Sequence, residues 1–138
     1  MECRVVIAGD AEGELLVSSE PLSFWGGYDY RTGEIIDRRH ALSGQIAAGR
    51  ILVLPFTRGS STTTQVLLEA IRIGTAPAAI ISTESDPFLA LAAIVSQEMY
   101  GHALPIVAID PADYVRLVTG QRALIQGDFL AISPSNEA

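Results

Sequence analysis

The stretch Arg50-Ile51-Leu52-Val53-Leu54-Pro55 decides the fold class, because it is a continuous apolar run and not an alternating one. Such a run is typical of a strand that is buried on both faces, as strands in parallel sheets are. Two further runs, Ala78–Ile81 and Pro105–Ile109, have the same character. The sequence therefore predicts an α/β fold with a small parallel sheet at its centre.

Two helical patterns separate these strands, as right-handed crossovers between parallel strands require. In the first, four apolar residues share one face: Val66, Leu67, Ala70 and Ile71. Gly74 is expected to end that helix. The second helix is expected to begin after Asp86 as its N-cap, with Pro87 in the first helical position, and to end at Gly101. Its apolar surface is expected to come largely from Leu89, Ala93, Val95 and Met99.

The two ends of the chain are expected to add a β layer to this unit. Short strands are expected at Arg4–Ala8 and Glu14–Ser18, joined by a turn at Gly9–Gly13, and at Arg122–Gln126 and Phe129–Ser133, joined by Gly127-Asp128. The segment Tyr28–Gln45 reads as an ordered loop with one short strand at Glu34–Asp37. Pro134–Ala138 is expected to fray. The chain is thus predicted to be one domain over residues 1–138.

Composition narrows the possible functions. The chain has 138 residues and a net charge of −7, and all nine basic residues are arginine. Nucleic-acid binding depends on clustered Lys and Arg, so an acidic chain is a poor candidate for it. The lack of lysine excludes lysine Schiff-base chemistry and a P-loop. A single cysteine, Cys3, permits no intrachain disulfide and cannot hold a zinc or iron–sulfur site alone.

The apolar content is high for a chain of this size. Hydrophobic residues make up 49% of the sequence, and the mean hydropathy is +0.32. No apolar run approaches the ~20 residues that span a bilayer, and no secretory signal is recognisable, so a cytoplasmic location is expected. The excess apolar content indicates either a well-filled core or a face that another protein covers.

The candidate site follows the first buried strand, where Phe56-Thr57-Arg58-Gly59-Ser60-Ser61-Thr62-Thr63-Thr64 leads into the first helix. In open parallel sheets ligands bind at the carboxyl ends of the strands, beside the N-terminus of the next helix. Arg58 is suited to grip a carboxylate, Gly59 lets the backbone approach closely, and Ser60 would project into the same space. Two interpretations stay open: an anion- or substrate-binding loop, and an elaborate Ser/Thr helix cap.

Other polar and aromatic residues carry weaker signals. His102 follows a helix end and is expected to interact with the last carbonyls. His40 lies in an irregular loop, either solvated or in contact with a partner or ligand, and nothing places it beside Ser60 to form a Ser–His–Asp triad. The stretch Phe24–Gly27 has a core interpretation and an interface interpretation.

Taken together, the longer motifs resemble the small subunit, or swivel domain, of the aconitase X family. The segments that carry the resemblance are Glu20–Gly27, Asp29, Thr32–His40, Gly49–Pro55, Arg58–Ser61, Leu67–Ile71 and Gly74–Ala78. They occur in the family's order over nearly the whole chain. The resemblance implies a swivelling β/β/α domain with a small parallel sheet, two main helices and an additional β layer.

Members of this family are hydro-lyases in which a large part carries the cysteines for an iron or iron–sulfur centre. The resemblance therefore implies a large catalytic subunit as partner and no metal bound by this chain alone. In the swivel domain of aconitase a serine removes a proton from carbon, which implies Ser60 as the catalytic base. Arg58 would bind a substrate carboxylate, with Gly59, Ser61 and Thr62 as further substrate-binding residues. Related loops often carry Gly or Cys where this chain has threonines, which affects loop shape and substrate preference.

The family offers two small hydroxy acids as substrates, cis-3-hydroxy-L-proline and mevalonate 5-phosphate. The Phe-Trp-Gly-Gly and Asp-Arg-Arg-His forms resemble the first group more closely, and the lack of lysine is consistent with a substrate without phosphate. Two other classes of hypothesis stay open. In the first, the chain is a non-catalytic module that binds anions or carries a phosphate on His40. In the second, it is a purely structural partner.

Overall fold

The computed structural model describes residues 1–57 and 61–133. Its elements are β1 (Arg4–Ile7), β2 (Ala11–Val17), α1 (Phe24–Gly27), β3 (Tyr28–Asp29), β4 (Glu34–Ile35), β5 (Ile51–Val53), α2 (Ser61–Ile73), β6 (Ala79–Ser82), α3 (Pro87–Tyr100), β7 (Ile106–Ala108), α4 (Pro111–Tyr114), β8 (Arg122–Gln126) and β9 (Phe129–Ser133). None of the helices in this described part is long and apolar enough to cross a membrane.

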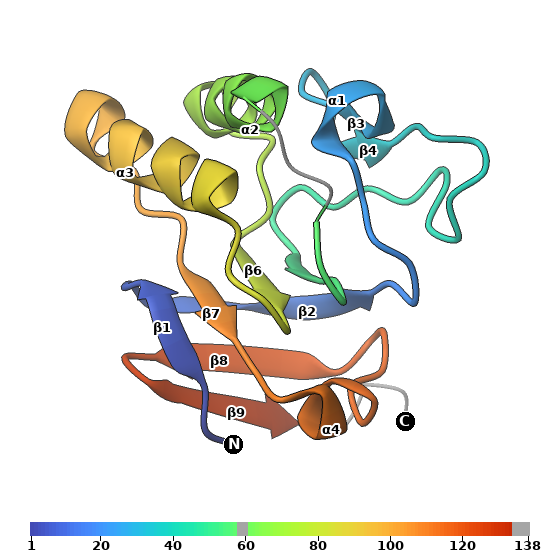
Figure 1. Ribbon diagram of the computed structural model, residues 1–138, viewed down its shortest axis with the longest axis vertical. Coiled ribbons are helices and arrows are strands. Elements are labelled where there is room, and N and C mark those ends of the chain that lie inside the picture. Colours follow the sequence, from blue (N-terminus) through green and yellow to red (C-terminus); the bar gives the residue numbers. More distant parts are fainter. Residues whose placement is uncertain (58–60, 134–138) are drawn as a thin grey trace.

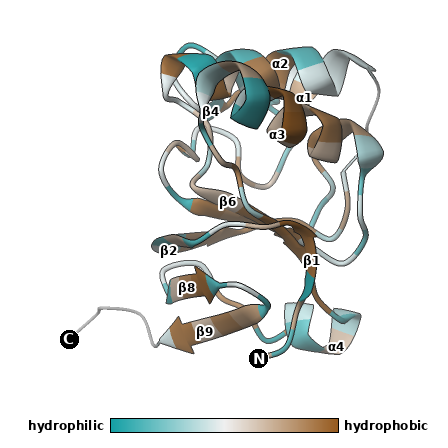
Figure 2. Ribbon diagram, turned by 90° about the vertical axis from the view of Figure 1, so that its left-hand side faces the viewer, coloured by the Kyte–Doolittle hydropathy of each residue, from teal (hydrophilic) through white to brown (hydrophobic). Residues whose placement is uncertain are grey.

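The elements form three layers. Helices α1, α2 and α3 lie on one side of the central strands, and the β8–β9 hairpin and α4 lie on the other (Figures 1 and 2). The strand order is β1-β7-β6-β5-β2-β8-β9, in which β7, β6, β5 and β2 run parallel. Strands β1 and β8 add to this parallel group in the antiparallel sense. The predicted parallel sheet, its two main helices and the additional β layer are confirmed.

Strand β2 joins the central sheet to the hairpin layer. Its first half, residues 11–14, pairs with β8, whereas residues 15–17 pair with β5. The predicted turn at Gly9–Gly13 is therefore too long, because residues with little β propensity extend the strand when β8 offers them a partner. The expectation that both chain ends form the extra layer is also corrected, since β1 and β2 belong to the central sheet.

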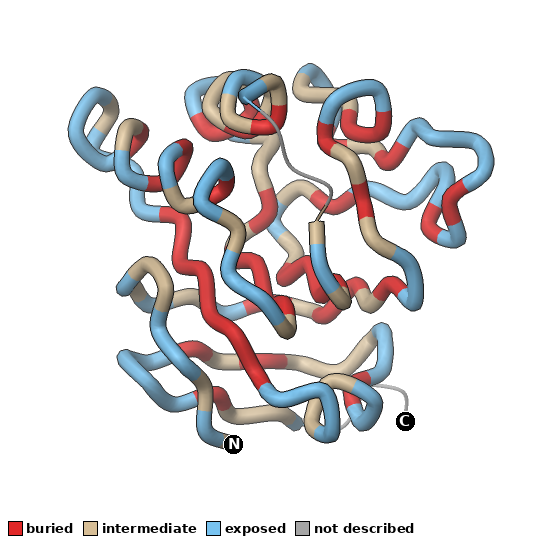
Figure 3. The backbone as a smooth tube through the Cα atoms, in the orientation of Figure 1, coloured by how far each residue is buried: buried red, intermediate tan, exposed pale blue. Residues whose placement is uncertain are grey.

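Strands β5, β6 and β7 are buried along their length (Figure 3). Their successive side chains belong alternately to two cores. One core lies under the helices and includes Leu16, Leu52, Leu54, Ile80, Leu67 and Leu89. The other lies against the hairpin and includes Leu15, Ile51, Val53, Ile81, Ile125 and Leu130. The continuous apolar runs of the sequence are explained by this arrangement, because every side chain of such a strand enters one core or the other.

The expected ends of the two main helices are confirmed. Asp86 caps α3, its carboxylate accepting the Phe88 backbone N–H at 2.8 Å. Gly101 ends α3 in the left-handed conformation with φ of 68°, which glycine adopts without steric cost. Gly74 follows α2 with φ of 96°. Of the residues expected to supply the apolar surface of α3, Leu89 and Ala93 are buried, whereas Met99 is 64% exposed.

The segment before β5 holds more structure than its composition predicts. The short elements α1 and β3 are not apparent from periodicity, and β4 ends at Ile35, before the predicted Asp37. Phe24 is fully buried and stacks at 5.2 Å from Tyr28, which confirms the core interpretation for that residue. Its neighbour Trp25 points away from the core and is 66% exposed.

Candidate active site

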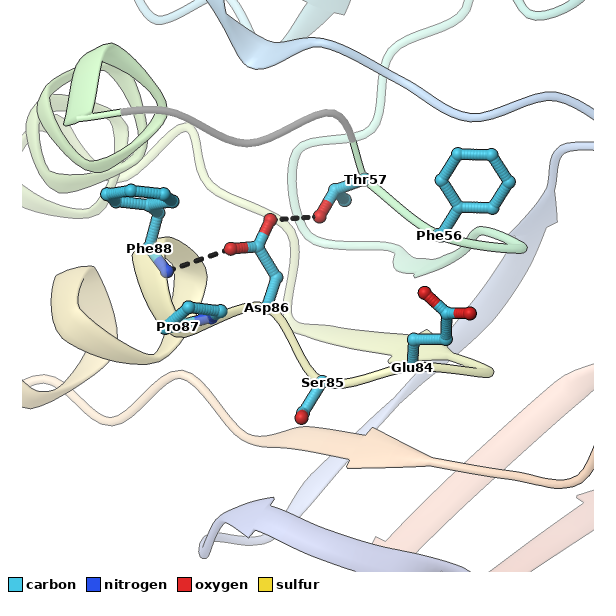
Figure 4. A pocket seen from close by; sticks show the side chains of 7 residues that line it. All are labelled: Phe56, Thr57, Glu84, Ser85, Asp86, Pro87 and Phe88. Atoms are coloured by element: carbon cyan, nitrogen blue, oxygen red, sulfur yellow. Dashed lines mark hydrogen bonds between the residues drawn. The ribbon is translucent and has the colours of Figure 1, made fainter.

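A cleft of about 220 Å³ lies at the carboxyl ends of β5 and β6. The described residues that line it follow directly after these two parallel strands: Phe56, Thr57, Glu84, Ser85, Asp86, Pro87 and Phe88. Figure 4 shows the two loops facing each other across it. This is the edge of an open parallel sheet at which ligands bind, as the sequence predicts.

Asp86 holds the two loops together. One carboxylate oxygen caps α3 through the Phe88 N–H, and the other accepts a hydrogen bond from the Thr57 hydroxyl (Figure 4). The sequence identifies Asp86 only as a helix cap. The bond to Thr57 depends on the parallel pairing of β5 with β6, which brings the two strand ends together. Because both oxygens are engaged within the chain, Asp86 acts here as a structural anchor.

A second contact ties α2 to the beginning of α3. The Thr64 hydroxyl, in the first turn of α2, donates to the Phe88 carbonyl at 2.9 Å. On the other side, Leu22 forms a parallel bridge with Thr57. Thr57 and Thr64, on either side of residues 58–60, are thus both hydrogen-bonded to the beginning of α3.

The predicted site residues fall partly within this frame. Arg58, Gly59 and Ser60 lie outside the described residues. Ser61 is the first residue of α2 and is exposed, and Thr62 follows it in the first helical turn. The N-terminus of this 13-residue helix carries the positive end of the helix dipole, which favours a bound anion.

Charge in the described lining of the cleft is negative. Glu84 is exposed and Asp86 is half-buried, and the described lining residues include no basic side chain. An anionic substrate held beside these carboxylates needs a cation supplied from elsewhere. In this sequence Arg58 directly follows the lining residue Thr57.

His40 is built into the fold. It is buried, its Nδ1 accepts the Leu42 N–H at 3.0 Å, and its Nε2 lies 3.1 Å from the Pro21 carbonyl. These partners place the ring proton on Nε2, because the Leu42 N–H donates to Nδ1 and the Pro21 carbonyl can only accept. With both nitrogens engaged, the side chain is poorly placed to carry a phosphate. His102, by contrast, is exposed just after α3.

Metal-ligating residues do not gather in the described part of the chain. No group of three or more His, Cys, Asp or Glu side chains there is placed to hold a metal ion. Cys3 directly precedes β1, and its thiol donates a hydrogen bond to the Asp128 backbone carbonyl at 3.2 Å. Burial, and then the charge of Asp128, raise the pKa of this thiol, so it stays protonated near neutral pH.

The comparison with protein families settles the relationship. The aconitase X swivel domain matches residues 1–132. The chain belongs to this family. A solved structure, Thermococcus kodakaraensis aconitase X in its holo form, superposes with a TM-score of 0.84 at 35% identity, covering 96% of this chain and 97% of that one. The fold of the aconitase X swivel domain is therefore the fold described above.

Two curated relatives bear names that describe an activity. A Pseudomonas aeruginosa protein named cis-3-hydroxy-L-proline dehydratase is 53% identical over 106 residues, which are 77% of this chain and 18% of that protein. A Methanothermobacter thermautotrophicus protein named phosphomevalonate dehydratase small subunit is 42% identical over 96 residues, 70% of this chain and 73% of that protein. The chain thus spans about a fifth of the length of the first relatives it matches.

Sequence reasoning missed three parts of the cleft: Thr57 as a bonded partner, the second role of Asp86, and Phe88 as a lining residue. A signal for them was available. Asp86 follows the end of β6 at the same distance as Thr57 follows the end of β5, so the parallel pairing of these strands brings the two residues to one sheet edge.

Proposed function

We propose that this chain is the small, swivelling part of an aconitase X hydro-lyase that dehydrates cis-3-hydroxy-L-proline. The observation that carries the choice of substrate is the 53% identity to a protein named for that reaction, against 42% for the small subunit named for phosphomevalonate. The absence of lysine in the whole sequence is consistent with a substrate that carries a carboxylate and no phosphate.

In this proposal Ser60 is the base that removes the proton from the carbon next to the substrate carboxylate. A serine hydroxyl is a weak base unless positive potential stabilises its alkoxide. Two features support such a potential: the arginine at position 58 and the N-terminus of α2, which begins at Ser61. Arg58 binds the substrate carboxylate, while Gly59, Ser61 and Thr62 provide further contacts.

The reaction balances as a loss of water. The proton on C2 goes to the serine oxygen, the electron pair of that bond forms the C2–C3 double bond, and the hydroxyl on C3 leaves. The product is an enamine, which rearranges to a cyclic imine of the same composition. Ser60 returns its proton to solvent and is ready for another cycle.

The iron or iron–sulfur centre of the family does not fit the described residues of this chain, which offer no cluster of ligands. We assign that centre, and the activation of the leaving hydroxyl, to the large chain. The steps proposed for this chain are therefore limited to proton removal and carboxylate binding. Activity is expected only when the two parts are together.

The test uses the large chain of the aconitase X enzyme from the same organism, co-produced with this one. The assembled pair is expected to convert cis-3-hydroxy-L-proline to the cyclic imine, and Ser60→Ala to lower kcat by about 10²–10⁴-fold, the usual contribution of a positioned base. Ser43→Ala, at an exposed loop position that does not line the cleft, is the matched control and should keep full activity.

The outcomes separate the parts of the proposal. Full activity in Ser60→Ala contradicts the base assignment. Turnover of mevalonate 5-phosphate without turnover of the proline derivative contradicts the substrate and leaves the base assignment standing. An assembled, metal-loaded pair that dehydrates neither compound contradicts the proposed reaction.

A further inference from the structure

The outer face of α3 is apolar over most of the helix, up to the last turn, where Gln97 and Glu98 are also exposed. Phe88, Leu91, Ile94 and Met99 are 36%, 49%, 52% and 64% exposed. Glu98 is the one charged residue that the sequence of this helix contains. The α3 ribbon is accordingly brown over much of its length (Figure 2). A surface helix of a monomer normally turns charged and polar residues outward, so this face is unusual.

These exposed residues are not needed for the core of the chain itself. The side of α3 that faces α2 and the sheet is filled by other residues: Leu89, Ala92, Ala93 and Ser96. Phe88, Leu91 and Ile94 instead form an outward stripe, in which each member follows the previous one by three positions. A helix with apolar residues all round is typical of one that is buried on all sides. In this chain by itself, α3 is buried on one side only.

The stripe begins at the cleft. Phe88 is both the first exposed apolar residue of α3 and part of the cleft lining, and its carbonyl receives the Thr64 hydroxyl from α2. A protein that completes the cleft from outside therefore borders Phe88, and the apolar stripe continues from that point. A partner that contacts Phe88 at the cleft could therefore also contact Leu91 and Ile94 further along α3.

We propose that the outer face of α3, formed by Phe88, Leu91, Ile94 and Met99, docks onto the large chain of the enzyme. This inference rests on the proposed function for the identity of the partner. It is supported by the relative in which the matched region is only 18% of the polypeptide, so that most of that protein lies outside the swivel part. Permanent assemblies of this kind use interfaces that are more apolar than transient ones.

Other occupants fit the face less well. Nucleic acid is excluded by the apolar stripe and its single carboxylate. A second copy of this chain would pair two stripes, but it would also bring two chains of net charge −7 together. The apolar groove of about 600 Å³ around Val115 and Val118 shares no lining residue with the cleft, so it serves as a comparison surface.

The experiment measures binding and does not depend on catalysis. The large chain is produced as a separate tagged polypeptide and titrated with this chain by calorimetry or biolayer interferometry. Ile94→Glu and Leu91→Glu are each expected to weaken binding about tenfold or more, because a charge is buried against an apolar partner. Ile94→Leu should bind as the wild type does.

Two control variants fix the meaning of the result. Val115→Glu places the same charge on an apolar residue that is 76% exposed in the other layer, and it is expected to bind normally. Ser60→Ala is expected to bind normally as well, so a failure of the proposed chemistry leaves this test unaffected. Circular dichroism checks that each glutamate variant is folded, which exposed positions on a helix favour.

Wild-type affinity in both α3 glutamate variants would overturn the proposal. So would a loss of binding confined to Val115→Glu, which would move the interface to the other layer. The proposal also fails if the free chain is a dimer that Ile94→Glu dissociates while binding of the large chain is unchanged.

Discussion

Helices α2 and α3 cover the same face of the same sheet, yet their outer sides differ. Both turn small and aliphatic residues inward, with Leu67 and Leu89 almost completely buried. The exposed residues of α2 are Ser61, Gln65, Arg72 and Ile73, whereas those of α3 are Pro87, Phe88, Leu91, Ile94, Gln97, Glu98 and Met99. The inward sides are explained by the sheet that both helices cover. The outer side of α3 has no such explanation within the chain and indicates a neighbour.

The largest effect is expected from the side that the two helices share. Leu67→Ala on α2 and Leu89→Ala on α3 each remove a fully buried side chain, so each should lower the free energy of unfolding by about 2–5 kcal/mol. Urea denaturation of the chain measures this. If one of the two variants has the same urea midpoint as the wild type, its helix does not depend on the buried leucine. The claim that α2 and α3 have equivalent inward faces would then be wrong.

A smaller effect is expected where α3 begins. Asp86→Ala removes the cap of α3 and the acceptor for Thr57, which should cost about 1–2 kcal/mol. Asp110→Ala is a matched control, since Asp110 also precedes a helical proline, in α4, but makes no side-chain cap bond. Equal changes in melting temperature for the two variants would show that the Asp86 contacts add nothing.

The end of α2 carries a pH-dependent contribution. The Tyr28 hydroxyl donates to the Thr75 carbonyl, just past α2, at 2.7 Å, and burial raises the pKa of this phenol well above its usual 10.0. Below pH about 10 the phenol is protonated in both the folded and the unfolded chain, and its contribution is complete. Above that pH the unfolded chain ionises first, so stability falls as pH rises.

Tyr28→Phe tests this contribution. The variant should lose about 1 kcal/mol at neutral pH, the usual value of one hydrogen bond. Its stability should also decline less steeply than that of the wild type between pH 9 and 11, a range set by the ordinary tyrosine pKa of about 10. Denaturation at several pH values gives both quantities, and parallel pH profiles for the two proteins would exclude Tyr28 as the cause.

The smallest effect is expected on the outer faces. In the chain alone, Ile94→Glu should change stability by less than about 0.5 kcal/mol, because an exposed side chain contributes little to the fold and glutamate favours a helix. Thermal unfolding measures it. A loss comparable to that of Leu89→Ala would mean that the outer face of α3 contributes to the core, and the docking argument would lose its premise.

The sequence predicts those parts of the fold whose signals are local. The continuous runs ending at Pro55 and Ile81, and the Asp86 and Gly101 boundaries of α3, are all found in the structure. What it does not predict depends on distant partners. Residues 11–14 become strand only because β8 lies beside them.

The same division applies to the site. The loop from Phe56 onward is apparent from its Arg-Gly-Ser-Ser motif and from its place after a buried strand. The bond between Thr57 and Asp86 joins residues 29 positions apart and follows from strand pairing, which a linear motif does not contain. His40 likewise resembles a functional residue in sequence and proves to be buried and fully bonded.

The difference between α2 and α3 is tested most directly by thiol labelling. In a Cys3→Ser background, Ile73→Cys on α2 and Ile94→Cys on α3 replace isoleucines that are 44% and 52% exposed. With saturating large chain, labelling at position 94 should slow by about tenfold or more, as for a side chain in the dry centre of an interface, while position 73 should change little. Unchanged labelling at position 94 in a formed complex would contradict the account.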